Sequence, residues 1–554
     1  MPSPEITRTT IMQASLFCKI IQAKKGEEQI WKNWFSSNGE IKLNNIVINQ
    51  AIKLDTEYEY TYPIILTNCS ITSLTLNRGS FNSYVKFDTS QISHIRINSD
   101  TIFYNQLFIT NCEIGNLFLD GSYKDEVYIF SNRFKNIFET RDPTFWDKII
   151  FNNNTFENSI RFWGGVFKRE FFLYDSMFKG DVSFQNTCFE KGLKIGENNI
   201  FESELNFQSG RYESLLIFGG QFKEVDINGG VFGRLSFSDN MKINDRLRLS
   251  FSFNLTINDL QIDFTKINCK NFLVENRNGQ ISSLKLEGII PKDTYCEFVS
   301  INTPTNINID NLTNFGYIYF KDVTYSTPKF SNEQLGFWVI KNSDLGKTTF
   351  MGSDFSRLYL DFKSSKITES FLSDTIMPSE IKSHDGVNSS EQQRLGYGQL
   401  KKIYENRGDA VSALEYYAKE MNALEKSKKI SLWEKINLFL GRISTNHGTN
   451  WARGLFSTMI CTLLCFSLIS LSSGISSSFT KVGWIFFCNN SIPAFLEFFN
   501  PLHKSKDIIS ILKSTKPELI KLTWAISVVD FLSKIFITYF EYQLIQAFRK
   551  HGKK

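Results

Sequence analysis

Apolar residues recur every five positions over several hundred residues of this chain. One clean run is Phe222, Ile227, Phe232 and Phe237, and a small or medium-sized residue stands two positions before each large one. A period of five is neither the 3.6-residue period of an amphipathic helix nor the two-residue alternation of a strand. It fits a coil of short strands with four sides per turn, in which both residues of each pair point inward. The pattern therefore predicts a solenoid whose turns bury their inner faces against one another.

The five-residue period is interrupted at intervals. Phe156, Phe167, Phe178 and Phe189 stand eleven residues apart, which corresponds to two repeats of five with one inserted residue. We expect these insertions to form bulged corners of the coil. Longer segments interrupt the period between positions 278 and 347.

From about Cys69 to Ile376 the pattern resembles that of the pentapeptide-repeat family. Gly, Val and Leu often replace the Ala that the family favours two positions before the central residue. The resemblance implies a mainly β fold, a right-handed quadrilateral β-helix, for residues 51–380. At ~4.8 Å per turn, such a coil would form a rod of order 70 Å. Residues 1–50 are expected to be an N-terminal helical cap that covers the open strand edges.

An all-α neck is predicted at residues 381–450. Glu391–Asn406 and Asp409–Lys429 have helical spacing of apolar residues and are joined at Arg407-Gly408, with Asp409 as the N-cap. This αα-hairpin resembles a single tetratricopeptide-type unit. Ser431–Arg442 follows as an amphipathic helix, which we expect to lie in a membrane interface.

Residues 451–554 are predicted to form a membrane module built on a transmembrane helical hairpin. The first transmembrane helix is expected at about 452–475, because its centre carries no charge and it can cross a ~30 Å hydrocarbon core. The second is expected at about 522–548. The segment 482–502 between them is rich in aromatic residues, and it either dips into the membrane or spans it.

The second predicted span carries a polar stripe on an otherwise apolar helix. Asp530, Lys534 and Glu541 fall within about 40° of one another, with Thr523 and Ser527 on the same side. Such a stripe must face protein or water rather than lipid. Two interpretations remain open: the stripe holds helices together, with Asp530 and Lys534 as an i,i+4 pair, or an oligomer turns it inward to line a pore.

Charge is unevenly distributed along the chain. The net charge is +5, but residues 51–380 are net acidic and the residues from 381 onward are net basic. The basic residues that flank the predicted spans are Arg442, Arg453, Arg549, Lys550, Lys553 and Lys554. The positive-inside rule then predicts a multi-pass protein of the inner (cytoplasmic) membrane with both termini in the cytoplasm.

No motif for enzymatic chemistry is found in the sequence. There is no P-loop, no GxGxxG after a strand, no HExxH and no GxSxG. The nine cysteines form no CxxC pair, and the five histidines are scattered singly. We therefore expect no catalytic residues, no cofactor and no metal site.

The chain as a whole resembles membrane-anchored pentapeptide-repeat proteins of bacteria, some of which carry channel-like labels. The leading hypothesis is a cytoplasmic β-helix that acts as a sensor or scaffold and is coupled to an oligomeric membrane module, a non-selective pore or other effector. The alternative is a membrane-tethered protein-binding platform without channel activity. A DNA mimic that binds topoisomerase is a third hypothesis, but it needs a denser negative surface. The expected partners are the lipid bilayer, further copies of the chain and a protein on the β-helix surface, and not nucleic acid.

Overall fold

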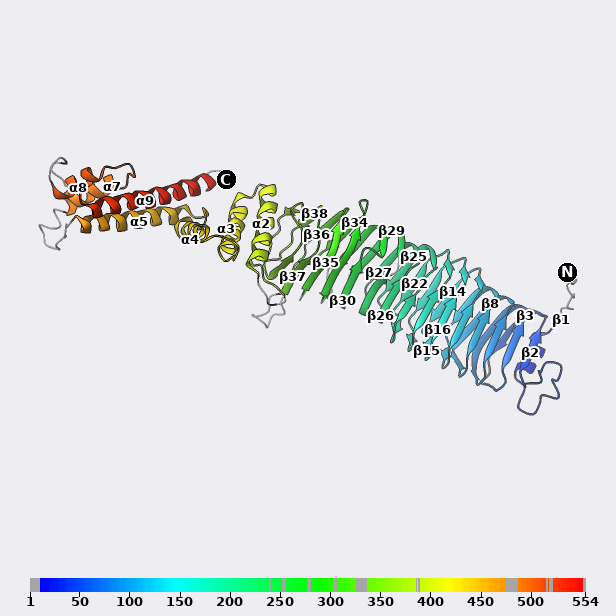
Figure 1. Ribbon diagram of the computed structural model, residues 1–554. Helices are drawn as coiled ribbons and strands as arrows, with labels where there is room; N and C mark the ends of the chain where they lie inside the picture. The colour runs from blue at the N-terminus through cyan, green and yellow to red at the C-terminus, as the bar shows by residue number, and fades with distance from the viewer. Residues whose placement is uncertain are drawn as a thin grey trace. The chain divides into compact units, whose positions relative to one another are not determined.

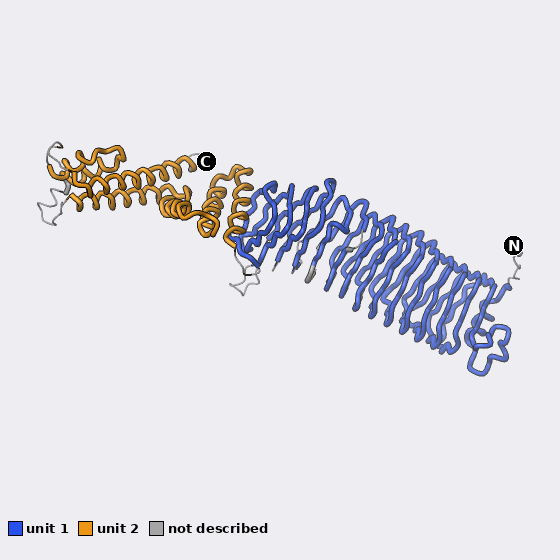
Figure 2. The backbone as a smooth tube through the Cα atoms, viewed as in Figure 1, with its two compact units in different colours: residues 1–384 blue, residues 385–554 orange. Residues whose placement is uncertain are grey.

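The computed structural model describes residues 10–551 except 239–240, 252–255, 277–279, 282, 303–305, 325–335, 385, 387–388, 474–486, 515–516 and 518–521. The chain divides into two compact units, Met1–His384 and Asp385–Lys554 (Figure 2). In the described residues, the first unit consists mainly of strands and the second is helical (Figure 1).

The first unit is a parallel β-solenoid of about 14 turns. Its strands run from β1 (Thr10–Ile11) to β40 (Phe371–Ser373), and they pair in parallel with strands of the preceding and following turns (Figure 1). A short helix, α1 (Ala14–Ile21), packs near β3 (Ile46–Leu54) at the N-terminal end. β1, β2 (Ile41–Asn44) and the first part of β3 lie inside the range 1–50 that was predicted to be the cap. The solenoid predicted from the five-residue period is confirmed.

The turn that begins at Leu107 shows how the five-residue period corresponds to short strands with inward-facing pairs. It consists of β9 (Leu107–Thr110), β10 (Glu113–Leu119) and β11 (Ser122–Tyr123), after which β12 (Val127–Phe130) pairs with β9. The buried inward pairs of this turn are Leu107 and Ile109, Cys112 and Ile114, Leu117 and Leu119, and Gly121 and Tyr123. Each pair packs on its equivalents in the neighbouring turns, so no turn can bury its inner face alone.

Aromatic rings form long stacks inside the solenoid. In the longest stack, adjacent ring centroids are 4.3 to 5.3 Å apart and the planes are within 18° of parallel. Its members are Tyr60, Phe81, Phe103, Tyr123, Phe145, Phe167, Phe189, Tyr212 and Phe232. A second stack contains Phe134, Phe156, Phe178, Phe201 and Phe222. The eleven-residue spacing in the sequence arises because successive phenylalanines of that run belong alternately to the two stacks.

The extra residue of each eleven-residue interval lies at a corner rather than within a strand. Three-residue corners occur at 135–137, between β13 (Arg133–Phe134) and β14 (Phe138–Arg141), and at 146–148, after β15 (Thr144–Phe145). The strands that flank these corners stay in register with the next turn. The longer corners therefore change the length of a turn without changing which side chains face inward.

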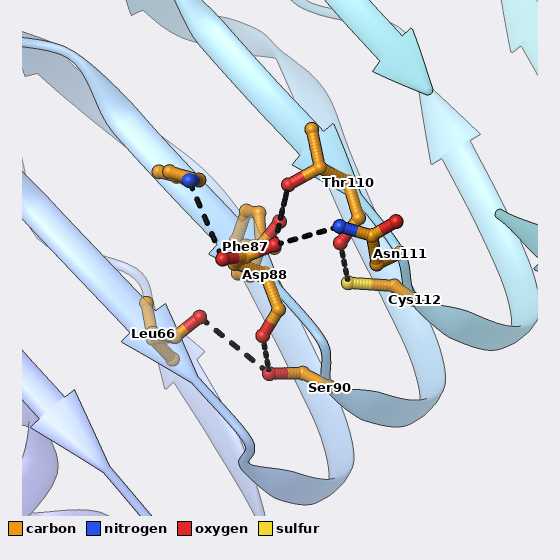
Figure 3. A network of polar contacts seen from close by, with 8 residues as sticks. Leu66, Phe87, Asp88, Ser90, Thr110, Asn111 and Cys112 are labelled. Carbon is orange, nitrogen blue, oxygen red and sulfur yellow. Dashed lines mark hydrogen bonds and ion pairs between the residues drawn. The ribbon is translucent and has the colours of Figure 1, made fainter. Parts of the chain in front are cut away.

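Left-handed backbone conformations recur at one corner of successive turns. The residues are Asn45, Asn68, Thr89, Asn111, Ser131, Asn153, Asp175 and Asn198, with φ between 48° and 59°. Most of these residues are Asn or Asp, whose short side chains tolerate this conformation better than those of most other residues. At this corner the carboxylate of Asp88 accepts hydrogen bonds from Thr110 (2.8 Å) and Asn111 (3.3 Å) of the next turn (Figure 3).

The residue after each left-handed corner is buried and in several turns polar. The side chain of Asn132 accepts from the Cys112 amide (2.8 Å) and donates to the Ile109 carbonyl (2.7 Å). Asn154 and Asn199 make equivalent bonds in later turns. These side chains satisfy backbone groups that the strand ladder leaves unpaired at the corner.

The second unit begins with paired helices. Its described helices are α2 (Ser390–Arg407), α3 (Ala410–Glu425), α4 (Leu432–Thr445), α5 (Trp451–Ser472), α7 (Ile492–Phe498), α8 (Ser505–Lys513) and α9 (Trp524–His551), with a π-helical turn at Phe487–Ser491. α2 ends at Gly408, whose φ is 82°, and the Asp409 carboxylate caps α3 by accepting from the Ser412 amide (3.0 Å). Ser431 and Glu434 form a capping box at the start of α4.

α5 and α9 lie side by side along much of their length (Figure 1). α5 occupies most of the predicted span 452–475, and α9 begins two residues into the predicted span 522–548. In the segment 482–502, the described part contains the π-helical turn and α7, and residues 482–486 lie outside the described residues. The buried side chains that join α5, α7, α8 and α9 are Cys465, Ile469, Ala494, Phe498, Ile508, Leu512 and Ile537.

By length and composition, α5 is the single described helix that qualifies as a candidate membrane span, with a mean hydropathy of 2.0. α9 is long enough, but it contains charged residues. The structure thus shows a packed helical pair, whereas a pair of transmembrane spans stays a prediction.

Candidate functional site

Asp530 is held on both carboxylate oxygens inside the second unit. Its Oδ1 lies 2.8 Å from His503 Nε2, and its Oδ2 accepts from Ser505 Oγ (2.6 Å) and lies 2.8 Å from Lys534 Nζ. Only 4% of Asp530 is exposed. These four residues, here called the Asp530 cluster, connect the first part of α9 to the start of α8 and to the segment just before it. A buried network of this kind restrains each of its members.

Both ring nitrogens of His503 face oxygen acceptors. Nδ1 lies 2.7 Å from the Asn500 carbonyl, and Nε2 faces Asp530. Because a carbonyl oxygen can only accept, Nδ1 donates to Asn500, and the two contacts fix the orientation of the ring. The cluster therefore places the imidazole of His503 and the ammonium of Lys534 around one carboxylate. Removal of the carboxylate would take away the shared partner of both groups.

The remaining residues of the predicted stripe do not join this cluster. Thr523 and Ser527 are exposed near the start of α9, where Ser527 Oγ donates to the Thr523 carbonyl (3.3 Å). Glu541 is half-buried three turns after Asp530, and it forms no hydrogen bond or ion pair within the described part of the chain. The Asp530–Lys534 pair of the first interpretation is present, but the stripe is not one continuous polar surface.

Sequence reasoning missed His503 and Ser505. They precede Asp530 by more than two dozen residues, and no spacing rule relates them to α9. The available signal was indirect, because a carboxylate in an apolar helix requires a partner, and His503 is one of only five histidines.

Most of the basic residues that were predicted to flank the membrane spans lie where α9 ends beside the neck helices. Arg442 pairs with Glu425 (3.3 Å), and Arg453 Nε donates to the Ile443 carbonyl (3.0 Å). Lys550 Nζ donates to the His447 carbonyl (3.2 Å) and lies 4.1 Å from the centre of the Tyr417 ring. Arg549 is exposed, whereas Lys553 and Lys554 lie outside the described residues.

His447 makes this junction sensitive to pH. Its Nε2 lies 3.1 Å from Asn422 Oδ1, and burial together with the charges of Lys550 and Arg442 lowers its pKa to about 4. An unfolded histidine has a pKa of about 6.5, so as the pH falls from 6.5 to 4 the unfolded chain binds the proton first and stability is lost. We expect the free energy of unfolding of the helical unit to fall by about 2 kcal/mol between pH 7 and pH 5.

Denaturation followed by circular dichroism at the two pH values measures this loss. The variant His447→Gln, which cannot titrate, should show a smaller difference between pH 7 and pH 5. An equal difference in both proteins would mean that His447 does not control it.

One outward face of the solenoid carries an apolar column. Phe108, Tyr128, Ile150 and Phe172 occupy equivalent outward positions in four successive turns, and all are partly exposed. Lys194 and Leu216 continue the column in the next two turns. Outward positions on a solvated sheet are usually polar, so an aligned column of aromatic and aliphatic side chains distinguishes this face of the solenoid.

The chain matches no protein-family model, no curated protein and no solved structure. Within the described ranges, no group of three or more His, Cys, Asp or Glu side chains is arranged to hold a metal ion.

Proposed function

We propose that this chain is a non-enzymatic membrane-anchored scaffold, whose helical unit inserts in a bilayer and whose β-solenoid binds a protein partner. The observation that carries the anchor is the outer surface of the α5–α9 pair. Phe456 and Leu464 on α5 are 67% and 59% exposed, and Phe531 and Ile535 on α9 are 64% and 51% exposed. Exposed apolar surface costs about 25 cal/mol per Å² in water and nothing comparable in lipid.

Unlike these exposed apolar side chains, the charged side chain of Asp530 on α9 lies away from the outer surface. Asp530 is buried against α8 and its preceding segment, so the lipid-facing side of the helix keeps apolar residues. This arrangement is the one expected for an ionisable residue inside a membrane. It supports α9 as the second membrane span, although its composition alone does not qualify it.

α4 supports an interfacial position for the start of α5. Leu432, Trp433 and Phe439 are exposed on this helix, and Lys435 and Arg442 flank them, with the Arg442 guanidinium 5.4 Å from the centre of the Phe439 ring. Amphipathic helices with exposed Trp and basic residues lie at the headgroup level. Since α5 begins and α9 ends beside this helix, we place the solenoid and both termini on the cytoplasmic side of an inner membrane.

The Asp530 cluster favours a scaffold over a pore. A pore lined by the polar stripe needs Asp530 and Lys534 to face water, but these residues bind each other, His503 and Ser505 within one chain. Opening the cluster would cost several kcal/mol. We propose further that the solenoid is a right-handed quadrilateral β-helix of the pentapeptide-repeat type, because its buried pairs follow the five-residue period.

Reconstitution in liposomes tests the anchor and the absence of a pore. The purified chain should stay with floated liposomes after an alkaline carbonate wash, and these liposomes should show no ion flux. Release of the chain by the wash would exclude the anchor. Ion flux that is lost in the variant Asp530→Asn would overturn the scaffold in favour of a pore.

A photo-crosslinking residue tests the partner surface in cells. Placed at Ile150 or at Phe172, in the apolar column, it should trap the same protein. Placed at Arg161, an exposed position on a different strand of the same turns, it should not. Equal trapping at all three positions would argue against the column as the binding surface.

A further inference from the structure

A groove of about 620 Å³ runs between α5 and α9 on their outer surface. Its buried side chains are Cys465, Ser533 and Phe540, and the partly buried Ser457 and Cys461 lie in line with Cys465 along α5. The large apolar residues that border the groove are exposed and include Ile460, Leu464, Leu532 and Phe536. Along α5 the bottom of the groove is therefore formed by small residues, and large apolar residues border it on both helices.

The groove has the length of an extended acyl chain rather than of a compact ligand. On α5 its lining runs from Arg453 to Leu468, which at 1.5 Å per residue is about 22 Å. One leaflet of a bilayer core is about 15 Å thick. A chain that enters at the Arg453 end therefore remains within the groove down to the middle of the membrane.

Arg453 is the one charged residue among those that line the groove, and it lies at one end of it. Arg453 is exposed, and its Nε donates to the Ile443 carbonyl, which holds the guanidinium beside the groove. Its two terminal nitrogens have no hydrogen-bond or ion-pair partner among the residues that the structure describes. A guanidinium in this position matches the geometry of a phosphate group and can bind it through two parallel hydrogen bonds.

We propose that the α5–α9 groove is a phospholipid site, in which an acyl chain lies along the small residues and Arg453 binds the phosphate. The inference rests on the proposed membrane anchor and adds a defined lipid to it. A phospholipid supplies both an apolar acyl chain for the groove and an anionic phosphate for Arg453. A helix from a second copy would also supply an apolar surface, and that occupant would be seen as a particle of two chains.

Native mass spectrometry of the full chain tests the site. The detergent-purified protein is delipidated, mixed with phosphatidylglycerol vesicles and measured for retained lipid. We expect one retained phospholipid per chain, reduced at least fivefold in Arg453→Gln and in Cys461→Trp, which fills the groove but keeps the arginine. The matched control Arg549→Gln removes another exposed arginine of the same unit and should retain lipid as the wild type does.

Retained lipid that is equal in all four proteins would overturn the proposal. So would a Cys461→Trp variant that retains lipid but converts a two-chain particle to a single chain, because the groove would then bind a second copy. Circular dichroism confirms that each variant is folded. Failure of the anchor is seen separately in the carbonate wash, since a chain that stays in liposomes but retains no lipid rejects the lipid site alone.

Discussion

Replacing Asp530 by Ala is expected to lower the free energy of unfolding of the helical unit by about 3–5 kcal/mol. The carboxylate is buried and accepts from His503, Ser505 and Lys534. Without it, the buried imidazole of His503 and the ammonium of Lys534 would both lose their shared partner. Unfolding of the helical unit in detergent, followed by circular dichroism against denaturant concentration, measures the loss.

Two further variants show whether the loss belongs to the cluster. Ser527→Ala removes an exposed hydroxyl from the same side of α9 and should change the stability by less than about 0.5 kcal/mol. The double variant Asp530→Ala with His503→Leu should recover part of the loss, because the unpaired imidazole is then also removed. If Asp530→Ala costs no more than Ser527→Ala, the cluster does not stabilise the unit, and the stripe would be available for another role.

Replacing Phe167 by Ala should destabilise the solenoid by about 3–5 kcal/mol. Its ring lies between those of Phe145 and Phe189, with centroids 5.1 and 4.4 Å away, and Phe171 contacts its edge at 5.3 Å. The substitution leaves a cavity in the longest aromatic stack and removes two stacked contacts. Because each turn contacts only its neighbours, the damage should be greatest in adjacent turns.

Hydrogen exchange of the full chain resolves this effect along the sequence. Backbone amides of the turns that contain Phe145 and Phe189 should lose more protection than amides of distant turns. Trp163→Ala is the matched control, because this ring is 49% exposed on the outside of the same region. Equal loss of protection in the two variants, or loss spread evenly over the solenoid, would contradict the role assigned to the stack.

The sequence by itself determined the solenoid, because the inward or outward direction of a side chain is a local property of an extended strand. Ile109, Ile114 and Leu119, spaced by five, are all buried in one turn. The boundary between the neck helices could also be predicted from local sequence, since Gly408 ends α2 and the adjacent Asp409 caps α3. The apolar length of α5 was likewise visible without any tertiary information.

Only the tertiary structure decided which distant residues meet. Phe156 and Phe167 have the same spacing to their neighbours in sequence, yet they belong to different stacks, because the lengths of the corners decide where each strand lies in a turn. In the same way, His503 reaches Asp530 only because the chain after α7 folds back against α9. Periodicity and capping report interactions within a few residues, whereas a buried charge is satisfied by whichever polar group the packing of helices brings to it.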